Sequence, residues 1–320
     1  MLVNGVWEKK WDPVQKQDKQ GRFIRQSSAF RETIPSDVVN LMAAGEYATP
    51  RFHLYVGYIC PWATRTLIAR SLLGLEQHIS VSVVEPQLTD EGWQFGDYPG
   101  STPEADEPVK FIHQLYTQTD PAYTGRATVP VLWDKQEQRI LNNESADILR
   151  IFNNDLKPLH QFGIDLSPAD RLPEIDAFNA RIYDSVNNGV YRTGFATSQQ
   201  AYEEAYTEVF EALDGLESHF ARHPFAVGEH LTESDIRLFV TLVRFDVAYY
   251  GLFKTNKKRI SDYPELSAYL ERLLQIPAFR NNTRIDHIKA GYYSIQALNP
   301  TGIVPAGPEL PWFKWFKEDL

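Results

Sequence analysis

The sequence predicts a chain of two dissimilar halves, an α/β half followed by an all-helical half. In the first half, short apolar runs typical of strands alternate with helical periodicity. From about residue 168 onward, only helical periodicity remains. The length of 320 residues is enough for two domains of ordinary size.

The α/β half predicts a small mixed sheet with helices. Its expected elements, in order, are a strand at 51–58, a helix at 61–75 stopped by Gly74, strands at 78–86, 127–134 and 139–141, and a helix capped by Ser145. Because a helix connects the first two strands, we expect them to be parallel.

The helical half predicts several amphipathic helices that pack as a bundle. The apolar residues that define its first two helices are Ile175, Phe178, Ile182 and Val186, and then Tyr202, Tyr206, Val209, Leu213, Leu216 and Phe220. A third helix begins at Thr232 with Asp235 as its reciprocal cap, and a fourth spans 264–274.

These patterns also predict the domain organisation. We expect an N-terminal extension at 1–50, an α/β domain at 51–160 and a helical domain at 161–320 that ends in a tail. A long interruption at 87–125 separates the second strand from the third. We expect the tail "PWFKWFKEDL" to pack against the body of the protein or a partner subunit.

Composition excludes several classes of function. A net charge of −10 disfavours a general nucleic-acid surface, and no apolar run approaches the roughly 20 residues of a membrane span. The N-terminus lacks a secretory signal, so a cytoplasmic location is expected. Neither a His/carboxylate cluster nor a Gly-rich dinucleotide turn occurs, so we expect no metal, NAD or flavin.

The only cysteine, Cys60, lies in "YVGYICPWATRT", between a predicted strand and a helix that opens with Pro61. Unpaired N–H groups at a helix start favour the thiolate and can bring a thiol below its free pKa of about 8.5. In a Cys-x-x-Cys redox centre the fourth residue is the resolving thiol, and here it is Ala63. A mixed disulfide at Cys60 would therefore need an external thiol, unless Cys60 is simply a small core residue.

Other residues of the first half are suited to a peptide-like thiol. A cis bond between Val129 and Pro130 would leave the Val129 backbone free to pair with a ligand, although an edge-strand proline is the alternative. Glu144 and Ser145 suit an ammonium and a carboxylate on one carbon, or they merely cap a helix. Arg126 could pair with a second carboxylate or be a solvated surface charge.

Six segments together resemble one known family, the glutathionyl-hydroquinone reductases, also called Xi-class glutathione transferases. The segments are "GYICPWATRT", "YTGRATVPVLWDK", "NNESADILRIFN", "VNNGVYRTGFATSQQAYE", "TESDIRLFVTLVRFD" and "NPTGIVPAGP". The resemblance covers nearly the whole chain and implies the glutathione transferase fold, with a thioredoxin-like N-terminal domain and an all-α C-terminal domain. It also implies a homodimer, with glutathione as the co-substrate that supplies the missing second thiol.

The resemblance also implies roles for individual residues. It makes Cys60 the catalytic nucleophile and places two tyrosines, Tyr191 and Tyr292, around the aromatic substrate. The positions that match glutathione binding are Trp93, Arg126, Val129, Glu144 and Ser145. The choice between Tyr292 and its neighbour Tyr293 stays open, because the residues that flank the pair depart from the family pattern.

Trp93 belongs to the interruption at 87–125, which is rich in aromatic residues. Irregular segments of this length in compact domains are commonly lids, so we expect an ordered flap over the thiol site. A loop that simply packs over the sheet edge is the alternative.

The expected activity is the removal of glutathione from glutathionyl-hydroquinones through a mixed disulfide of Cys60 with glutathione, which releases glutathione disulfide. Two alternatives remain: a cysteine-type transferase that acts on other mixed disulfides or haloacyl compounds, and a non-catalytic binding module of the same fold.

Overall fold

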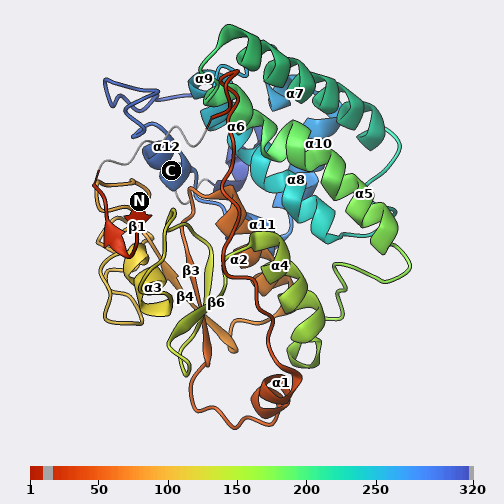
Figure 1. The fold of residues 1–320 in the computed structure, drawn as a ribbon. Helices are drawn as coiled ribbons and strands as arrows, with labels where there is room; N and C mark the ends of the chain where they lie inside the picture. The colour runs from red at the N-terminus through yellow and green to blue at the C-terminus, as the bar shows by residue number, and fades with distance from the viewer. Residues whose placement is uncertain (10–16, 317–320) are drawn as a thin grey trace. The chain divides into compact units, whose positions relative to one another are not determined.

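A computed structural model describes residues 1–9 and 17–316 (Figure 1). The chain divides into two compact units. The first consists of Met1–Trp11 and Gln26–Ile164, and the second of Asp12–Arg25 and Asp165–Leu320. The N-terminal segment therefore contributes to both units.

The first unit is built on a four-stranded sheet of order β4-β3-β5-β6. Its strands are β3 (Phe52–Val56), β4 (Ile79–Val83), β5 (Val131–Asp134) and β6 (Arg139–Asn142). β3 and β4 run parallel, whereas β5 pairs antiparallel with both β3 and β6. This arrangement confirms the mixed sheet and the parallel first pair that the sequence predicts.

Helices cover both faces of the sheet. Figure 1 shows α3 on one side and α2 and α4 on the other. The remaining elements of the unit are β1 (Leu2–Val3), β2 (Val6–Trp7), α1 (Ser36–Ala43), α2 (Pro61–Leu73), α3 (Ile112–Thr119), α4 (Ser145–Arg150), the π-helical turn η1 (Ile151–Asp155) and the 3₁₀ turn η2 (Lys157–Leu159). Helix α2 ends as predicted at Gly74, whose φ of 69° is the left-handed conformation that glycine adopts at low cost.

The interruption at 87–125 is not irregular throughout, because it contains helix α3. Much of its aromatic content is core: Phe95, Tyr116 and Tyr123 are all buried. Ahead of α3 the chain lies along the edge strand β4, where Thr102 and Val83 exchange backbone and hydroxyl hydrogen bonds of 2.8 and 2.9 Å. This part of the chain matches the alternative prediction, a segment that packs over the sheet edge.

The opposite edge strand, β6, is covered by the N-terminal segment. The Glu32 N–H donates to the Leu141 carbonyl at 3.1 Å, and the Asn143 N–H donates to the Phe30 carbonyl at 3.0 Å. Pairing of this kind leaves no exposed row of donors and acceptors along β6. Residues 30–32 are thereby fixed beside the end of the sheet that leads into α4.

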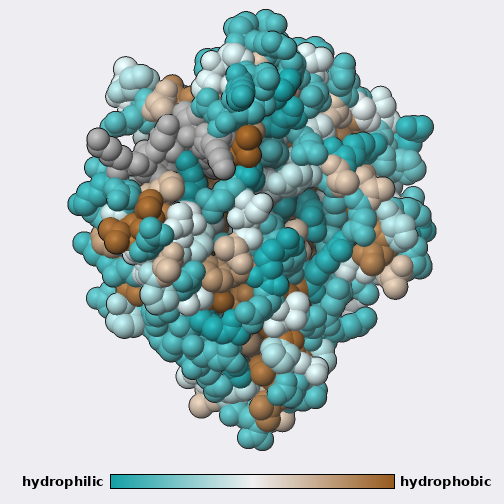
Figure 2. Space-filling model, viewed as in Figure 1, coloured by the Kyte–Doolittle hydropathy of each residue, from teal (hydrophilic) through white to brown (hydrophobic). Residues whose placement is uncertain are grey.

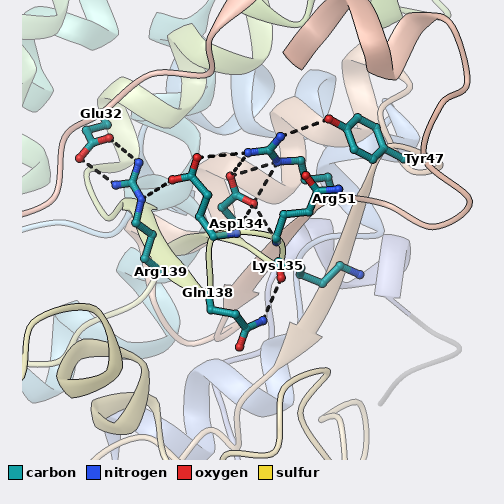
Figure 3. A network of polar contacts seen from close by, with 9 residues as sticks. Glu32, Tyr47, Arg51, Asp134, Lys135, Gln138 and Arg139 are labelled. Atoms are coloured by element: carbon teal, nitrogen blue, oxygen red, sulfur yellow. Dashed lines mark hydrogen bonds and ion pairs between the residues drawn. The ribbon is translucent and has the colours of Figure 1, made fainter. Parts of the chain in front are cut away.

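An ion-pair network joins the strands at the end of the sheet where β3 begins and β5 ends (Figure 3). Arg51, just before β3, binds the Asp134 carboxylate at the end of β5 at 2.6 Å, and both side chains are at least nine-tenths buried. The hydrogen bond with Asp134 raises the pKa of Arg51 further above its ordinary value. Arg51 also donates to the Tyr47 hydroxyl at 3.1 Å.

The second unit is entirely helical in its regular structure. Its elements are α5 (Leu172–Ile182), η3 (Tyr183–Asn187), α6 (Gly189–Gly194), α7 (Gln199–Phe220), α8 (Glu233–Arg244), η4 (Phe245–Tyr249), α9 (Tyr250–Leu252), η5 (Ile260–Asp262), α10 (Pro264–Leu274), α11 (Pro277–Arg280), α12 (Ile285–Tyr292) and η6 (Pro311–Phe316). Two of these, η3 and η4, are π-helical turns that continue α5 and α8.

Capping residues behave as the sequence predicts at α8 but not at α4. The Asp235 carboxylate accepts a hydrogen bond from the Thr232 N–H at 2.9 Å, which confirms the reciprocal cap. At α4, however, the N-cap is Glu144, whose carboxylate accepts from the Ala146 N–H at 3.2 Å, and Ser145 is the first helical residue. The prediction of Ser145 as the cap is therefore wrong by one position.

A segment near the N-terminus and the C-terminal tail both pack within the helical unit. Near the N-terminus, Arg22 pairs with Glu204 of α7, and the Phe23 ring stacks on Phe195. Near the C-terminus, Trp312 is fully buried in η6. The described part of the tail thus packs against the body of the protein, as expected, while residues 317–320 lie outside the described range.

On the face seen in Figure 2, hydrophilic residues predominate and apolar residues form small separate patches. Isolated apolar side chains of this kind are normal on folded proteins. No helix within the described ranges is long and apolar enough to cross a membrane.

Candidate active site

Cys60 lies at the N-cap of α2, directly after the loop that follows β3. Its N–H donates to the Gly57 carbonyl, and its carbonyl accepts from the Thr64 N–H, both at 3.0 Å. Pro61, as predicted, is the first helical residue. The side chain is partly exposed, at the end of a helix where amide N–H groups favour a thiolate.

Ala63 occupies the fourth position of the motif and is fully buried in α2. Cys60 is the chain's only cysteine, so no second thiol can form an internal disulfide with it.

Val129, one of the residues predicted to bind the ligand, contacts the thiol. The Cys60 Sγ donates to the Val129 carbonyl oxygen at 3.3 Å. The Val129–Pro130 peptide bond is cis, as the sequence predicts. Among the described residues, none accepts a hydrogen bond from the Val129 N–H. The carbonyl oxygen of Val129 thus lies beside the sulfur.

Glu144 and Ser145 lie together at the start of α4. Glu144 is half-buried, and each of its carboxylate oxygens accepts one hydrogen bond: Oε1 from the Ala146 N–H at 3.2 Å, and Oε2 from the Ser28 hydroxyl at 2.9 Å. A carboxylate held in this way keeps lone pairs on both oxygens for a ligand cation.

A buried cation that the sequence did not predict lies beside Ser145. Arg65 of α2 is 2% exposed, and its Nη1 donates to the Ser145 hydroxyl at 3.4 Å. Its guanidinium also lies 4.4 Å from the centre of the Trp62 ring. The only signal in the sequence was its position five residues after Cys60. Its charge makes the neighbourhood of Ser145 suitable for a carboxylate.

Arg126 and Trp93 belong to the same unit as Cys60. Arg126 is half-buried, and its N–H donates to the Gln26 side-chain oxygen at 3.0 Å. Trp93 is also half-buried, and its carbonyl accepts from the Ile112 N–H at the start of α3, at 3.0 Å. The segment that carries Trp93 is thereby attached to a helix.

Tyr191 and Tyr292 are brought together in the helical unit, with their hydroxyl oxygens 2.5 Å apart. A third tyrosine that the sequence analysis missed, Tyr249, extends the chain of hydroxyls, because its oxygen lies 2.8 Å from that of Tyr292. Tyr249 and Tyr292 are almost fully buried, whereas Tyr191 is half-buried. The structure therefore selects Tyr292 over Tyr293 as the partner of Tyr191.

Burial raises the pKa of Tyr249 and of Tyr292 well above 10, while the nearby charge of Arg244 acts in the opposite direction. Burial is the larger effect, so both hydroxyls stay protonated at neutral pH and can donate hydrogen bonds. Arg244 is itself fully buried.

The tyrosines come from three different segments. Tyr191 lies in α6, just after the π-helical turn η3, while Tyr249 ends the π-helical turn η4 and Tyr292 ends α12. π-helical turns are rare and occur frequently at functional sites.

Within the described ranges, no group of three or more His, Cys, Asp or Glu side chains is arranged to hold a metal ion.

Family models match both units of the chain. Residues 59–155 match the N-terminal domain of glutathione S-transferases, and residues 199–272 match the C-terminal domain. The chain is also 46% identical to the glutathionyl-hydroquinone reductase PcpF of Sphingobium chlorophenolicum, over 97% of each chain. It is likewise 46% identical to the glutathionyl-hydroquinone reductase YqjG of Escherichia coli, over 96% of this chain and 94% of that protein.

Solved structures give the same result. The glutathione-bound structure of YqjG from Escherichia coli superimposes with a TM-score of 0.85 at 43% identity, over 98% of this chain and 97% of that one. The Xi glutathione transferase of Phanerochaete chrysosporium also gives a TM-score of 0.85, at 42% identity, over 92% of this chain and 97% of that one. With identity of this extent and a common fold, the chain belongs to the glutathionyl-hydroquinone reductases, the Xi class of the glutathione transferases.

Proposed function

We propose that the protein reduces glutathionyl-hydroquinones to hydroquinones with glutathione as the reductant, and that Cys60 is the nucleophile. The observation that carries the proposal is the position of Cys60, a lone thiol at the start of α2, 3.3 Å from the Val129 carbonyl oxygen, with Ala63 in place of a resolving cysteine. The relatives named glutathionyl-hydroquinone reductases support the reaction class.

The reaction has two steps. In the first, the Cys60 thiolate attacks the glutathione sulfur of the substrate, a sulfur–sulfur bond forms, and the sulfur–carbon bond breaks. The electron pair of that bond goes to the ring carbon, which takes up one proton, so the hydroquinone is released. In the second, the thiolate of a free glutathione attacks the mixed disulfide, releases Cys60 as a thiolate and leaves as glutathione disulfide.

Glutathione is a tripeptide, and the first unit has complementary groups. The Val129 N–H and carbonyl would pair with the backbone of the central cysteine. Glu144 would bind the ammonium group, and Ser145 with Arg65 behind it would bind the carboxylate on the same carbon. Arg126 would bind the second carboxylate, and the Trp93 ring would pack on the tripeptide.

The tyrosine hydroxyls of the second unit would assist the release of the hydroquinone. Either oxygen can be the donor in both of the hydrogen bonds that join them. Tyr191 is the half-buried member of the three, so its hydroxyl is the one accessible to a substrate. Tyr191 is then the residue that contacts a hydroquinone oxygen, and Tyr292 acts through it.

Mass spectrometry of the wild type and of a Cys60→Ser variant tests the proposal. Wild-type protein mixed with a glutathionyl-hydroquinone, without free glutathione, should gain one glutathione at Cys60 and release one equivalent of hydroquinone. Cys60→Ser should gain none and lose turnover, while it still binds glutathione. Full turnover by the serine variant would refute the mechanism.

One further relative favours a second candidate function. The chain is 43% identical, over 93% of its length, to a Schizosaccharomyces pombe protein named glutathione S-transferase omega-like 2. A cysteine-type transferase that acts on other mixed disulfides would use the same Cys60 adduct. Comparison of turnover on a glutathionyl-hydroquinone with turnover on a simple glutathione mixed disulfide would separate the two activities.

A further inference from the structure

The N-terminal segment from Gln26 to Glu32 lies against the residues proposed to bind glutathione. The closest contact is that of Ser28, whose hydroxyl donates to Glu144 Oε2 at 2.9 Å. The same oxygen of Ser28 lies 3.2 Å from the Asn143 carbonyl. Because Ser28 and Glu144 are 116 residues apart in sequence, their contact is a feature of the tertiary structure alone.

The Glu144 carboxylate is therefore held from two directions. The Ala146 N–H fixes Oε1 from within α4, and the Ser28 hydroxyl fixes Oε2 from the N-terminal segment. A glutamate side chain has several rotatable bonds, and ordering it for a ligand takes entropy from the binding free energy. A carboxylate already held at both oxygens avoids much of that loss.

The segment that carries Ser28 is itself firmly attached. Arg31 makes two hydrogen bonds of 2.7 Å with the Asp147 carboxylate. Next to it, the Glu32 carboxylate accepts two hydrogen bonds from Arg139, at 2.8 and 2.7 Å (Figure 3). Together with the backbone pairing of residues 30–32 to β6, these contacts give Ser28 a fixed position.

A second side chain of the segment reaches the loop of Arg126. The Gln26 side-chain oxygen accepts from the Arg126 N–H at 3.0 Å, and its nitrogen donates to the Tyr123 hydroxyl at 3.3 Å. The Tyr123 hydroxyl in turn donates to the Arg126 carbonyl at 3.2 Å. The segment thus contacts both ends of the proposed tripeptide site, at Glu144 and at Arg126.

We propose that Ser28 is a positioning residue of the glutathione site, which orients the Glu144 carboxylate toward the ammonium group of glutathione. The proposal rests on the proposed function and adds the N-terminal segment to the binding machinery. A purely structural role is the alternative, in which the Ser28 hydroxyl only fixes the segment to α4. The two roles differ in which ligand group is affected when the hydroxyl is lost.

The experiment measures the affinity for glutathione by titration calorimetry in four variants. Ser28→Ala removes the hydroxyl, whereas Ser28→Thr keeps it. Ser28→Val has the shape of the threonine without the hydroxyl, and it keeps the test valid if the alanine variant does not fold. Ser27→Ala is the matched control, because Ser27 is exposed and makes no hydrogen bond with another described residue.

Because Ser28 orients Glu144 and does not itself touch the ligand, loss of its hydroxyl should weaken glutathione binding by less than the loss of a direct charged hydrogen bond, about five- to tenfold in Ser28→Ala and Ser28→Val. Ser28→Thr and Ser27→Ala should bind like the wild type. In turnover, the KM for glutathione should rise while kcat stays close to that of the wild type, because Ser28 does not touch the reacting atoms.

A glutathione analogue without the α-amino group provides the discriminating measurement. It has no ammonium for Glu144 to bind, so Ser28→Ala and the wild type should bind it equally. Equal loss of affinity for glutathione and for the analogue would mean a structural role and overturn the proposal, as would wild-type affinity of Ser28→Ala for glutathione. Failure of the wild type to bind glutathione at all would instead overturn the proposed function, and this inference with it.

Discussion

Tyr191, Tyr249 and Tyr292 form a chain of hydroxyls whose members should contribute differently to turnover and to stability. Replacement of each by phenylalanine removes one hydroxyl and keeps the ring. Tyr191 is the most exposed of the three and is proposed to contact the hydroquinone, so Tyr191→Phe removes the donor itself. Positioned acid catalysis typically contributes 10²- to 10⁴-fold, and partial compensation by the other hydroxyls leads us to expect a loss of roughly tenfold or more.

The other two variants leave the Tyr191 hydroxyl in place and act on the reaction through it. Tyr292→Phe removes the hydrogen bond that supports the Tyr191 hydroxyl, and a neutral hydrogen bond of about 1 kcal/mol corresponds to a loss of about fivefold. Tyr249→Phe removes the hydrogen bond between Tyr249 and Tyr292 and leaves the one between Tyr292 and Tyr191, so its effect on turnover should be below about twofold. The expected order of turnover loss is Tyr191, Tyr292, Tyr249.

Stability should follow a different order. Tyr292→Phe removes both of the hydrogen bonds that the Tyr292 hydroxyl makes inside a buried cluster, which should cost about 2 kcal/mol of unfolding free energy. Tyr249→Phe should cost about 1 kcal/mol, and the half-buried Tyr191→Phe less. The neighbouring Tyr293→Phe is the control, because the Tyr293 hydroxyl bonds to no described residue.

Single-turnover release of hydroquinone and denaturant unfolding measure the two orders separately. If turnover loss follows stability loss across the three variants, the hydroxyls act only in packing and the proposed role of Tyr191 is wrong. Because burial raises the pKa of Tyr249 and Tyr292 well above 10, neither should lose its proton between pH 7 and pH 9. The single-turnover rate should therefore show no decrease from these tyrosines over that range.

Three further predictions concern other residues. Ala63→Cys should shorten the lifetime of the glutathione adduct by trapping part of the enzyme as a disulfide with Cys60, and an unchanged adduct lifetime and thiol count would show that position 63 cannot resolve the adduct. Glu144→Gln should weaken glutathione binding by about 1.5 to 3 kcal/mol in a calorimetric titration, since it removes the charge that faces the ammonium group. Burial raises the pKa of Asp235 from 3.8 to about 6. The protonated carboxyl therefore stabilises the folded state most below pH 4, and the free energy of unfolding should fall by about 3 kcal/mol as the pH rises from 4 to above 6. Unfolding free energies at pH 4 and pH 7 should show this decrease in the wild type and not in Asp235→Asn.

The parts of the fold that could be predicted are those that local pattern determines. Strands β3 and β4, helix α2 and its stop at Gly74 all follow from short apolar runs and one glycine. Helix α3 was not predicted because it is only eight residues long and follows a stretch rich in glycine, proline and acidic residues, so its three buried residues, Ile112, Leu115 and Tyr116, form too short a pattern. At α4, both Glu144 and Ser145 suit an N-cap, and only the backbone conformation decides between them.

In the candidate site, too, some residues could be predicted from local pattern and others could not. Cys60 and Val129 could be singled out because each lies beside a proline at the end of a predicted element. Arg65 gave little signal, because a lone arginine in a helix is normally exposed, yet this one is buried against Trp62 and Ser145. The contact between Ser28 and Glu144 could not be predicted, because nothing in the sequence indicates that two polar residues 116 positions apart lie close together.

Tyr249 could not be found for a reason of helix geometry. A periodicity argument assumes about 3.6 residues per turn throughout, which fixes the direction of every side chain along the helix. A π-helical turn adds one residue and rotates all later side chains by about 100° about the axis. Tyr249 ends such a turn, η4, and Tyr191 follows another, η3. The extra residue of η4 therefore changes the direction in which Tyr249 points relative to a regular helix, and in the structure its ring lies 5.9 Å from the Tyr191 ring, centre to centre.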